Sequence, residues 1–176
     1  MAAVAIPAGE ADGGPFGITV LSRAFDDQLA LDLAARVLGV DSPLVVEAGV
    51  DVLVVGAHLR GQPLNRELEE LGARFVRAVT TSDAYRLVAL DTRPRKPGLL
   101  RVGPGAGSPI AGEVWRLSAG ALGTLLAALP APMSLGQVEL VDGAWVVGFG
   151  CTVESGAAGT DITAAGGWVA ALRHGW

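Results

Sequence analysis

The stretch from Val50 to Leu71 reads VDVLVVGAHLRGQPLNRELEEL and places an apolar run, a loop and a short polar segment in succession. The run Val50–Ala57 is rich in β-branched residues, which predicts a buried and central strand. Small residues where this strand closes, at Gly56 and Ala57, allow a ligand to approach the backbone N–H groups. Asn65 precedes RELEEL as a helix cap, and Gly72 predicts the end of that helix. The stretch therefore predicts a strand, a ligand-accessible loop and a helix.

Toward the C-terminus the sequence continues as short strands separated by turns. Asp142-Gly143 is a type I′ hairpin signal between two strands, Gln137–Val141 and Trp145–Cys151. The glycine-rich segment GPGAGSP at residues 103–109 lacks the Lys-Ser/Thr of a phosphate loop and precedes a strand, so it is interpreted as a plain turn. Many short strands with a few inserted helices predict an α+β fold whose antiparallel or mixed sheet curls toward a barrel.

Toward the N-terminus the composition is different. Residues 1–16 are rich in Gly, Pro and Ala and are interpreted as an irregular arm, followed by a short strand at Gly17–Ser22. Asp26 opens a helix that extends to Leu38 and is stopped by Gly39. Its apolar stripe, formed by Leu29, Leu33 and Val37, requires a partner surface, which is either the rest of the chain or a second subunit.

Composition excludes several classes of protein. The 176 residues are 51% hydrophobic and 18% charged, which is typical of a folded domain. A net charge of −5 provides no basic footprint for nucleic acid or an anionic membrane. No apolar stretch approaches the roughly 20 residues that span a bilayer, and no basic n-region indicates a signal peptide. Cys151, a single cysteine expected in the core, is consistent with a reducing, cytoplasmic compartment.

Two residues are candidates for chemistry. His58 can donate or accept a proton near neutral pH, the alternative being a hydrogen-bonded histidine at a strand end. Lys96, in the loop TRPRKPG, can serve as the cation for an acidic ligand, the alternative being a solvated surface lysine. The other histidine, His174, is far away in sequence, and neither histidine belongs to a metal-binding pattern. We therefore expect no metal and no cofactor, and no serine-hydrolase motif is present.

The sequence resembles the C-terminal domain of allophanate hydrolase from about Val50 to Leu172. The resemblance is carried, in order, by VVGAHLRGQPLNRELEELGARFV, YRLVAL, RKPGLLRV, GEVWRL, PAPMSLGQVELVDG, GFGCTVES and DITAAGGW. The preceding VAIPAG…DGGPFGITVLSRAFDDQLALDLAARVLG is similar to the very end of an amidase-signature domain. We therefore divide the chain into residues 1–43, an arm and helix of amidase type, and residues 44–176, the allophanate hydrolase C-terminal-like domain.

This resemblance implies a γ-glutamylcyclotransferase-like mixed β-barrel with inserted helices. Residues 55–59 stand where cyclotransferases have a YGSNL-type substrate loop. The family's C-terminal domain acts on N-carboxycarbamate, the amidase product. Binding this dianion requires N–H donors and a cation, from the backbone of Gly56–Leu59 with Asn65 and Lys96, and its breakdown requires a proton, delivered by His58 as general acid. Tyr85 is expected in the core or in the pocket wall.

Three functions remain open. The first is an enzyme that assists decarboxylation of N-carboxycarbamate, or of a related carbamate or dicarboxylate, in urea and allophanate degradation. The second is a non-catalytic binding or assembly module, or a truncated remnant, that partners a separate amidase chain. The third is cyclotransferase-like chemistry, although the stretch before GEVW contains no acid before Glu113. The Ser–Ser–Lys residues of amidases have no counterpart, so amide hydrolysis is not expected. A homodimer formed through the arm is also possible.

Overall fold

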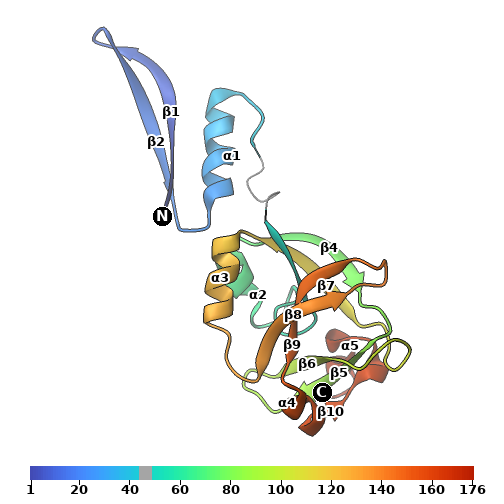
Figure 1. The fold of residues 1–176 in the computed structure, drawn as a ribbon. Helices are drawn as coiled ribbons and strands as arrows, with labels where there is room; N and C mark the ends of the chain where they lie inside the picture. Colours follow the sequence, from blue (N-terminus) through green and yellow to red (C-terminus); the bar gives the residue numbers. More distant parts are fainter. Residues whose placement is uncertain (44–48) are drawn as a thin grey trace.

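The computed structural model describes residues 1–43 and 49–176 (Figure 1). An N-terminal arm contains β1 (Ala2–Ala11), β2 (Gly14–Ser22) and α1 (Asp27–Leu38). The remaining elements form one α+β domain: β3 (Val50–Val54), α2 (Asn65–Glu70), β4 (Arg74–Thr80), β5 (Tyr85–Leu90), β6 (Lys96–Arg101), β7 (Ala111–Leu117), α3 (Ala119–Ala127), β8 (Met133–Glu139), β9 (Trp145–Cys151), α4 (Val153–Ala158), β10 (Thr160–Asp161), the 3₁₀ helix η2 (Thr163–Ala165) and α5 (Trp168–Arg173).

The main sheet has five strands in the order β4-β7-β3-β9-β8. Its centre is β3, the predicted apolar strand, which pairs antiparallel with β7 and parallel with β9. Val52, Leu53 and Val54 are almost completely buried, since layers cover both faces of this strand. A smaller sheet, β10-β5-β6, packs against the main one through β6 and β9.

The main sheet closes on itself at one end. Its two edge strands are β4 and β8, and a bridge between Thr81 and Leu140, directly after them, joins the two edges. The backbone N–H of Ser82 also donates to the carbonyl oxygen of Glu139 at 2.9 Å. Closure removes the open edge at this end of the sheet, and the predicted α+β fold with a mixed sheet curled into a barrel is confirmed. The hairpin predicted at Asp142-Gly143 is also present, since β8 and β9 pair antiparallel around it.

The prediction of an irregular arm over residues 1–16 is wrong. Residues 2–22 form one long antiparallel hairpin with a register shift between Pro7 and Gly9. Its turn is Asp12-Gly13, and both residues have positive φ, as a type I′ turn requires. The Gly, Pro and Ala content obscured this signal, because small residues leave little of the apolar alternation that identifies a strand.

Helix α1 begins and ends as predicted, but its packing is different. Gly39 ends it in the left-handed conformation, with its N–H donating to the carbonyl oxygen of Ala35. Helix α1 packs on β1 and β2, and its buried residues are Gln28, Ala30, Ala34 and Ala35. The apolar stripe Leu29, Leu33 and Val37 is instead 43–60% exposed, so the expectation that it packs onto the domain is wrong. Alanines face the hairpin because their small side chains permit close approach of its backbone.

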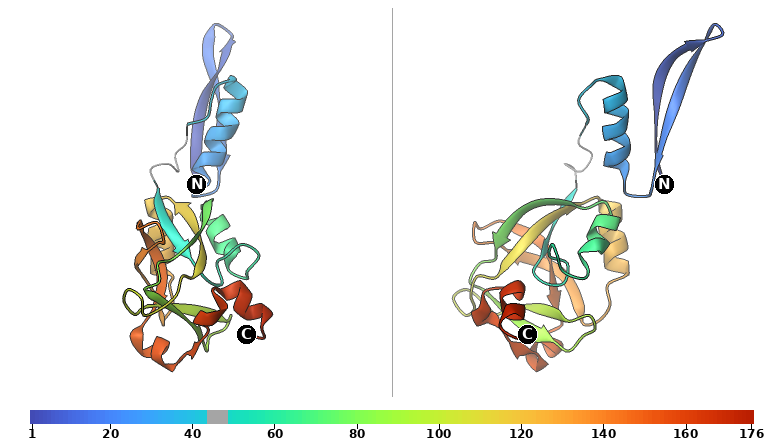
Figure 2. Two further views of the ribbon diagram at one scale, coloured as in Figure 1. Left: turned by 90° about the vertical axis from the view of Figure 1, so that its right-hand side faces the viewer. Right: turned by 180° about the vertical axis from the view of Figure 1, so that it is seen from behind.

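The arm projects away from the domain in all three ribbon views (Figure 2). Phe25 is half-buried against the domain core, and its carbonyl oxygen would lie only 2.0 Å from a Cβ at Gly72. One ion pair also crosses this junction, between Arg74 and Asp32 at 3.6 Å. The predicted boundary between residues 43 and 44 borders residues 44–48, which lie outside the described residues, and it stays a prediction. Within the described residues, no helix has the length and apolar character needed to cross a membrane.

Candidate functional site

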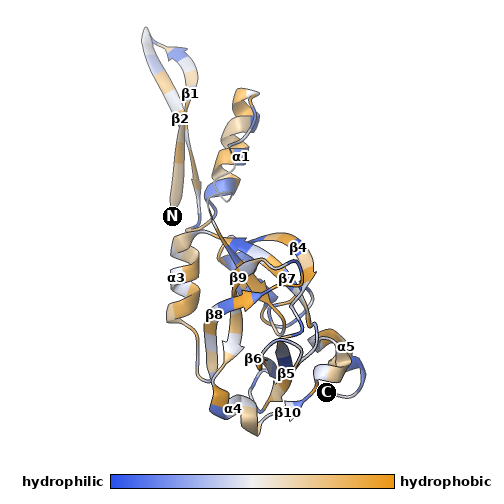
Figure 3. Cartoon of the chain, turned by 45° about the vertical axis from the view of Figure 1, so that its right-hand side comes forward, coloured by the Kyte–Doolittle hydropathy of each residue, from blue (hydrophilic) through white to orange (hydrophobic). Residues whose placement is uncertain are grey.

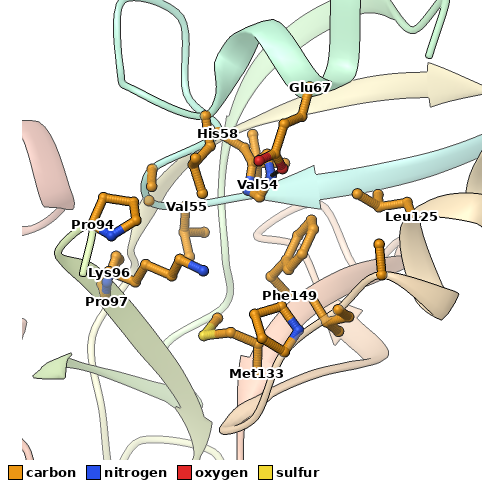
Figure 4. Close-up of a pocket in the computed structure, with 16 residues that line it drawn as sticks. Val54, Val55, His58, Glu67, Pro94, Lys96, Pro97, Leu125, Met133 and Phe149 are labelled. Carbon is orange, nitrogen blue, oxygen red and sulfur yellow. Dashed lines mark hydrogen bonds and ion pairs between the residues drawn. The ribbon is translucent and has the colours of Figure 1, made fainter. Parts of the chain in front are cut away.

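A cavity of about 260 Å³ opens where β3 ends (Figure 4). Its walls are mostly apolar, and three polar side chains reach it: His58, Glu67 and Lys96. Few polar groups in an otherwise apolar cavity are typical of a small-molecule site. The apolar residues of the wall are Val54, Val55, Ala57, Leu64, Pro94, Pro97, Leu125, Ala128, Leu129, Pro130, Met133 and Phe149.

The loop after β3 is held by a compact set of hydrogen bonds. The N–H of Leu59 donates to the carbonyl oxygen of Gly56, and the N–H of Leu64 donates to that of Ala57, each at 2.9 Å. Leu59 therefore does not offer its N–H to a ligand, contrary to the expectation for the whole run Gly56–Leu59. In the described part of the chain, no hydrogen bond engages the N–H groups of Ala57 and His58. The N–H of Gly56 is likewise not engaged, so three amides of the run Gly56–Leu59 remain as backbone donors for an anion.

Gly56 lines the cavity and also permits a close contact that the sequence did not predict. A Cβ at this position would lie 2.4 Å from Cδ of Pro97 and 2.5 Å from its Cγ. The absence of a side chain admits the ring of Pro97 against the backbone, and Gly56 itself is part of the cavity wall. This close approach brings the start of β6, and with it Lys96, beside the loop that carries His58.

His58 is buried between an aromatic ring and a carboxylate. Its imidazole stacks on the ring of Phe149, with centroids 4.8 Å apart, and its Nε2 lies 3.0 Å from Oε2 of Glu67. Burial lowers the pKa of His58 below its ordinary value, and the positive charge of Lys96 adds to this, while the hydrogen bond and charge of Glu67 oppose it. The imidazole is therefore neutral at pH 7. With Nε2–H donating to Glu67, its Nδ1 is the free acceptor.

Lys96 is half-buried, and its ammonium group points into the cavity between Val55 and Met133 (Figure 4). No ion pair to it is found among the described residues. It is also the chain's sole lysine, since the other twelve basic residues are arginines. A cation without a carboxylate partner at an apolar cavity provides a natural counter-charge for an anionic ligand.

The remaining predicted residues lie behind the cavity. Leu59 is in the core and outside the cavity wall. Asn65 is the first residue of α2 and not its cap, and its Nδ2 donates to the carbonyl oxygen of His58 at 2.9 Å. It therefore orients the loop and does not line the cavity. Tyr85 is buried in the core, where its hydroxyl accepts a hydrogen bond from the N–H of Glu139.

Sequence reasoning missed Glu67 and the apolar wall. Glu67 is one of three glutamates in RELEEL, and only the orientation of α2 singles it out. Phe149 and Met133 come from β9 and β8, far along the chain, and their apolar character indicated only burial.

Several other features lie outside the cavity. The segment 103–109 contributes nothing to its wall, and neither does Glu113. Cys151 is buried, and burial raises the pKa of its thiol. No cluster of metal-binding side chains occurs in the residues described. A larger hollow of about 890 Å³, beside α4 and the β5–β6 connection, contains none of the predicted site residues.

These observations define a class: an α+β protein with a barrel-like mixed sheet and a small apolar pocket that contains a histidine–carboxylate pair and a lysine. The family model for the allophanate hydrolase C-terminal domain matches residues 50–173, and the chain belongs to this family. The predicted γ-glutamylcyclotransferase-like form of the α+β fold agrees with this membership.

Among similar proteins, urea amidolyase from Lachancea kluyveri is 38% identical over 86% of this chain and 10% of its own length. The structure of Kluyveromyces lactis allophanate hydrolase matches 98% of this chain and 33% of its own, with 35% identity and a TM-score of 0.72. The structure of c4763, a uropathogenic E. coli-specific protein, matches 72% of this chain and 98% of its own, with 30% identity and a TM-score of 0.66. This chain thus spans about a tenth of the urea amidolyases it matches and a third of the allophanate hydrolase.

Proposed function

We propose that this chain binds a small dianion in the cavity at the end of β3 and assists the decarboxylation of N-carboxycarbamate, a step in urea and allophanate degradation. The observation that carries the proposal is the convergence of His58, Glu67 and Lys96 on one apolar cavity. Membership of the allophanate hydrolase C-terminal family supports the substrate class. The predicted cytoplasmic location is part of this proposal, because the pathway uses small soluble intermediates.

Each half of the dianion has a place in this site. The ammonium of Lys96 pairs with one carboxylate, and the N–H groups of Ala57 and His58 receive the other. Net charge −5 gives no long-range attraction for anions, so binding depends on these local donors. The apolar wall around them weakens the competition from water and strengthens each interaction.

The reaction requires one proton. Cleavage of a carboxylate C–N bond releases carbon dioxide and leaves the electron pair on nitrogen, which takes up a proton to give carbamate. His58 is neutral before binding, because burial lowers its pKa. A dianion beside the ring favours the charged imidazolium and raises that pKa. His58 therefore takes up a proton as the ligand binds and donates it to nitrogen as general acid, with Glu67 orienting the ring.

The test uses malonate as a stable dicarboxylate and N-carboxycarbamate generated in place from allophanate by an amidase. Calorimetry in buffers of different ionisation enthalpy should show malonate binding with proton uptake. The variant Lys96→Ala should bind malonate roughly 10-fold to 100-fold more weakly, the loss expected for a charged hydrogen bond. His58→Ala should abolish the acceleration of carbon dioxide release, and His58→Gln, which keeps a polar side chain, should do the same.

Arg66→Ala is the matched control, because Arg66 forms an exposed ion pair with Glu70 on α2 and does not reach the cavity. Unchanged carbon dioxide release in a folded histidine variant would remove His58 from the mechanism. A wild-type chain that neither binds malonate nor releases carbon dioxide would contradict the proposal as a whole.

A second candidate function, assembly with a separate amidase chain, is favoured by the arm. The hairpin and α1 expose Phe16, Ile18, Leu21, Leu29, Leu33 and Val37. Figure 3 shows that stretches of hydrophobic colour run along these elements. Exposed apolar residues of this density indicate an interaction surface. In the K. lactis allophanate hydrolase, the matching segment is a third of a longer chain. We infer that the arm docks onto an amidase polypeptide, which would supply the substrate of the cavity.

A further inference from the structure

We propose that Glu113 is a positioning residue, which holds the loop carrying His58 through Arg60 and so sets the environment of the imidazole. This goes beyond the proposed function, because Glu113 contacts neither the cavity nor its ligand. The first observation is the place of Glu113. It lies in β7, paired with Val54 of β3 on one side and Ala78 of β4 on the other, so its backbone is fixed in the middle of the main sheet.

The carboxylate of Glu113 is nearly buried and accepts three hydrogen bonds. Its side chain is 13% exposed. Oε2 accepts the backbone N–H of Arg60 at 3.1 Å and the indole N–H of Trp115 at 3.1 Å, while Oε1 accepts Nε of Arg60 at 3.0 Å. A carboxylate that binds both the main chain and the side chain of one residue fixes that residue in position and orientation.

An aromatic ring also contacts the half-exposed side chain of Arg60. Its guanidinium lies 3.7 Å from the centroid of the Phe75 ring, and Phe75 meets Trp115 edge to face at 5.8 Å. The cation, the two rings and the carboxylate therefore form one cluster, none of whose residues lines the cavity. A cation over an aromatic face, paired at the same time with a carboxylate, is held more firmly than an exposed ion pair.

Arg60 is two residues from His58, so the anchor acts on the segment that carries the imidazole. A second hydrogen bond holds the same segment: Nδ2 of Asn65 donates to the carbonyl oxygen of His58 at 2.9 Å. The loop is thus tied to β7 by Glu113 and to α2 by Asn65. Between these ties the side chain of His58 is held against Phe149 and Glu67.

The chain is well suited to a direct test, because its only histidines are His58 and His174. Imidazole signals in NMR spectra can be assigned with a His174→Gln background, and the titration of His58 can be followed without any ligand. In Glu113→Ala the loop should loosen and admit water, and the pKa of His58 should rise toward its ordinary value of 6.5. Glu113→Gln, which retains one acceptor oxygen, should give an intermediate shift. Malonate affinity should decrease at least 5-fold in Glu113→Ala.

Arg60→Ala provides a second route to the same result, since Arg60 is half exposed and its removal leaves β7 intact. It applies if Glu113→Ala does not fold. Glu70→Ala is the control, because it removes a carboxylate from an exposed ion pair away from the loop. A wild-type His58 titration in folded Glu113→Ala, or in Arg60→Ala together with Glu113→Gln, would overturn the proposal. Because this titration needs no ligand, failure of the proposed function, seen as no malonate binding by the wild type, is distinguished from failure of the positioning role.

Discussion

At the scale of single residues, the neutral state of His58 has a consequence for stability. Burial lowers its pKa in the folded chain, whereas in the unfolded chain the imidazole titrates near 6.5. Between these two values the unfolded state binds more protons than the folded state, so stability rises with pH across that interval. The contribution of neutral His58 to the free energy of unfolding is fully present above pH 6.5 and is lost as the pH falls below 6.5. Each unit by which the pKa is lowered corresponds to about 1.4 kcal/mol.

We therefore expect urea unfolding of the wild type to show a steeper loss of stability as the pH falls below about 6.5 than unfolding of His58→Gln, whose side chain does not titrate. His174→Gln serves as the matched variant, because His174 is exposed near the C-terminus. It should retain the wild-type profile. An equally steep profile in His58→Gln would show that the acid sensitivity arises elsewhere.

At the scale of elements, the approach of β6 to the loop after β3 depends on Gly56. Gly56→Ala places a methyl group 2.4 Å from a rigid proline ring, so the backbone must shift. Chemical denaturation should show a destabilisation of about 1–3 kcal/mol, the usual cost of overpacking. Gly123→Ala is the matched control: Gly123 is exposed in α3 with no atom within 4 Å of its Cβ position. Gly123→Ala should raise the free energy of unfolding by about 0.5–1 kcal/mol, because alanine loses less backbone entropy than glycine when it enters a helix. An unchanged free energy of unfolding in Gly56→Ala would contradict this prediction, because it would show that Pro97 can move away from the added methyl group at little cost.

The elements also show what the sequence can and cannot predict. The central position of β3, the helix from Asp27 to Leu38 and the hairpin at Asp142-Gly143 follow from local patterns, since apolar runs, caps and turn residues act over a few positions. His58 and Lys96 were singled out as chemical groups, and the structure brings both to one cavity. Their neighbours were not predictable, because the contact between Gly56 and Pro97 and the stacking of His58 on Phe149 join distant parts of the chain.

At the scale of the whole molecule, the exposed apolar residues of the N-terminal arm predict that the chain assembles with another polypeptide. Burying one large apolar side chain contributes roughly 1.5–3 kcal/mol of favourable free energy. A partner that covers Leu29, Leu33 and Val37 would therefore bind with a substantial contribution from the hydrophobic effect. A purified amidase chain from the same organism should form a complex with this chain in analytical ultracentrifugation. Replacing all three residues with serine should abolish that complex.

Three exposed alanines of the same arm, Ala3, Ala8 and Ala11, provide a matched serine variant that should retain binding. Self-association of the chain alone, lost in the same triple variant, would instead identify a second copy as the partner. A monomeric chain that gives no complex with the amidase would contradict the docking inference.

The order of strands in the main sheet determines how the chain can fold as it is made. Val52 pairs with Trp115 on one side and with Val147 on the other, so both flanks of the most apolar strand emerge from the ribosome long after it does. The arm uses only neighbours in sequence and can form early. The nascent chain therefore carries β3 without a partner until β7 is made and without its second partner until β9 is made. This makes the half-made chain a natural client for chaperones and leaves any chain terminated before β9 without a complete sheet.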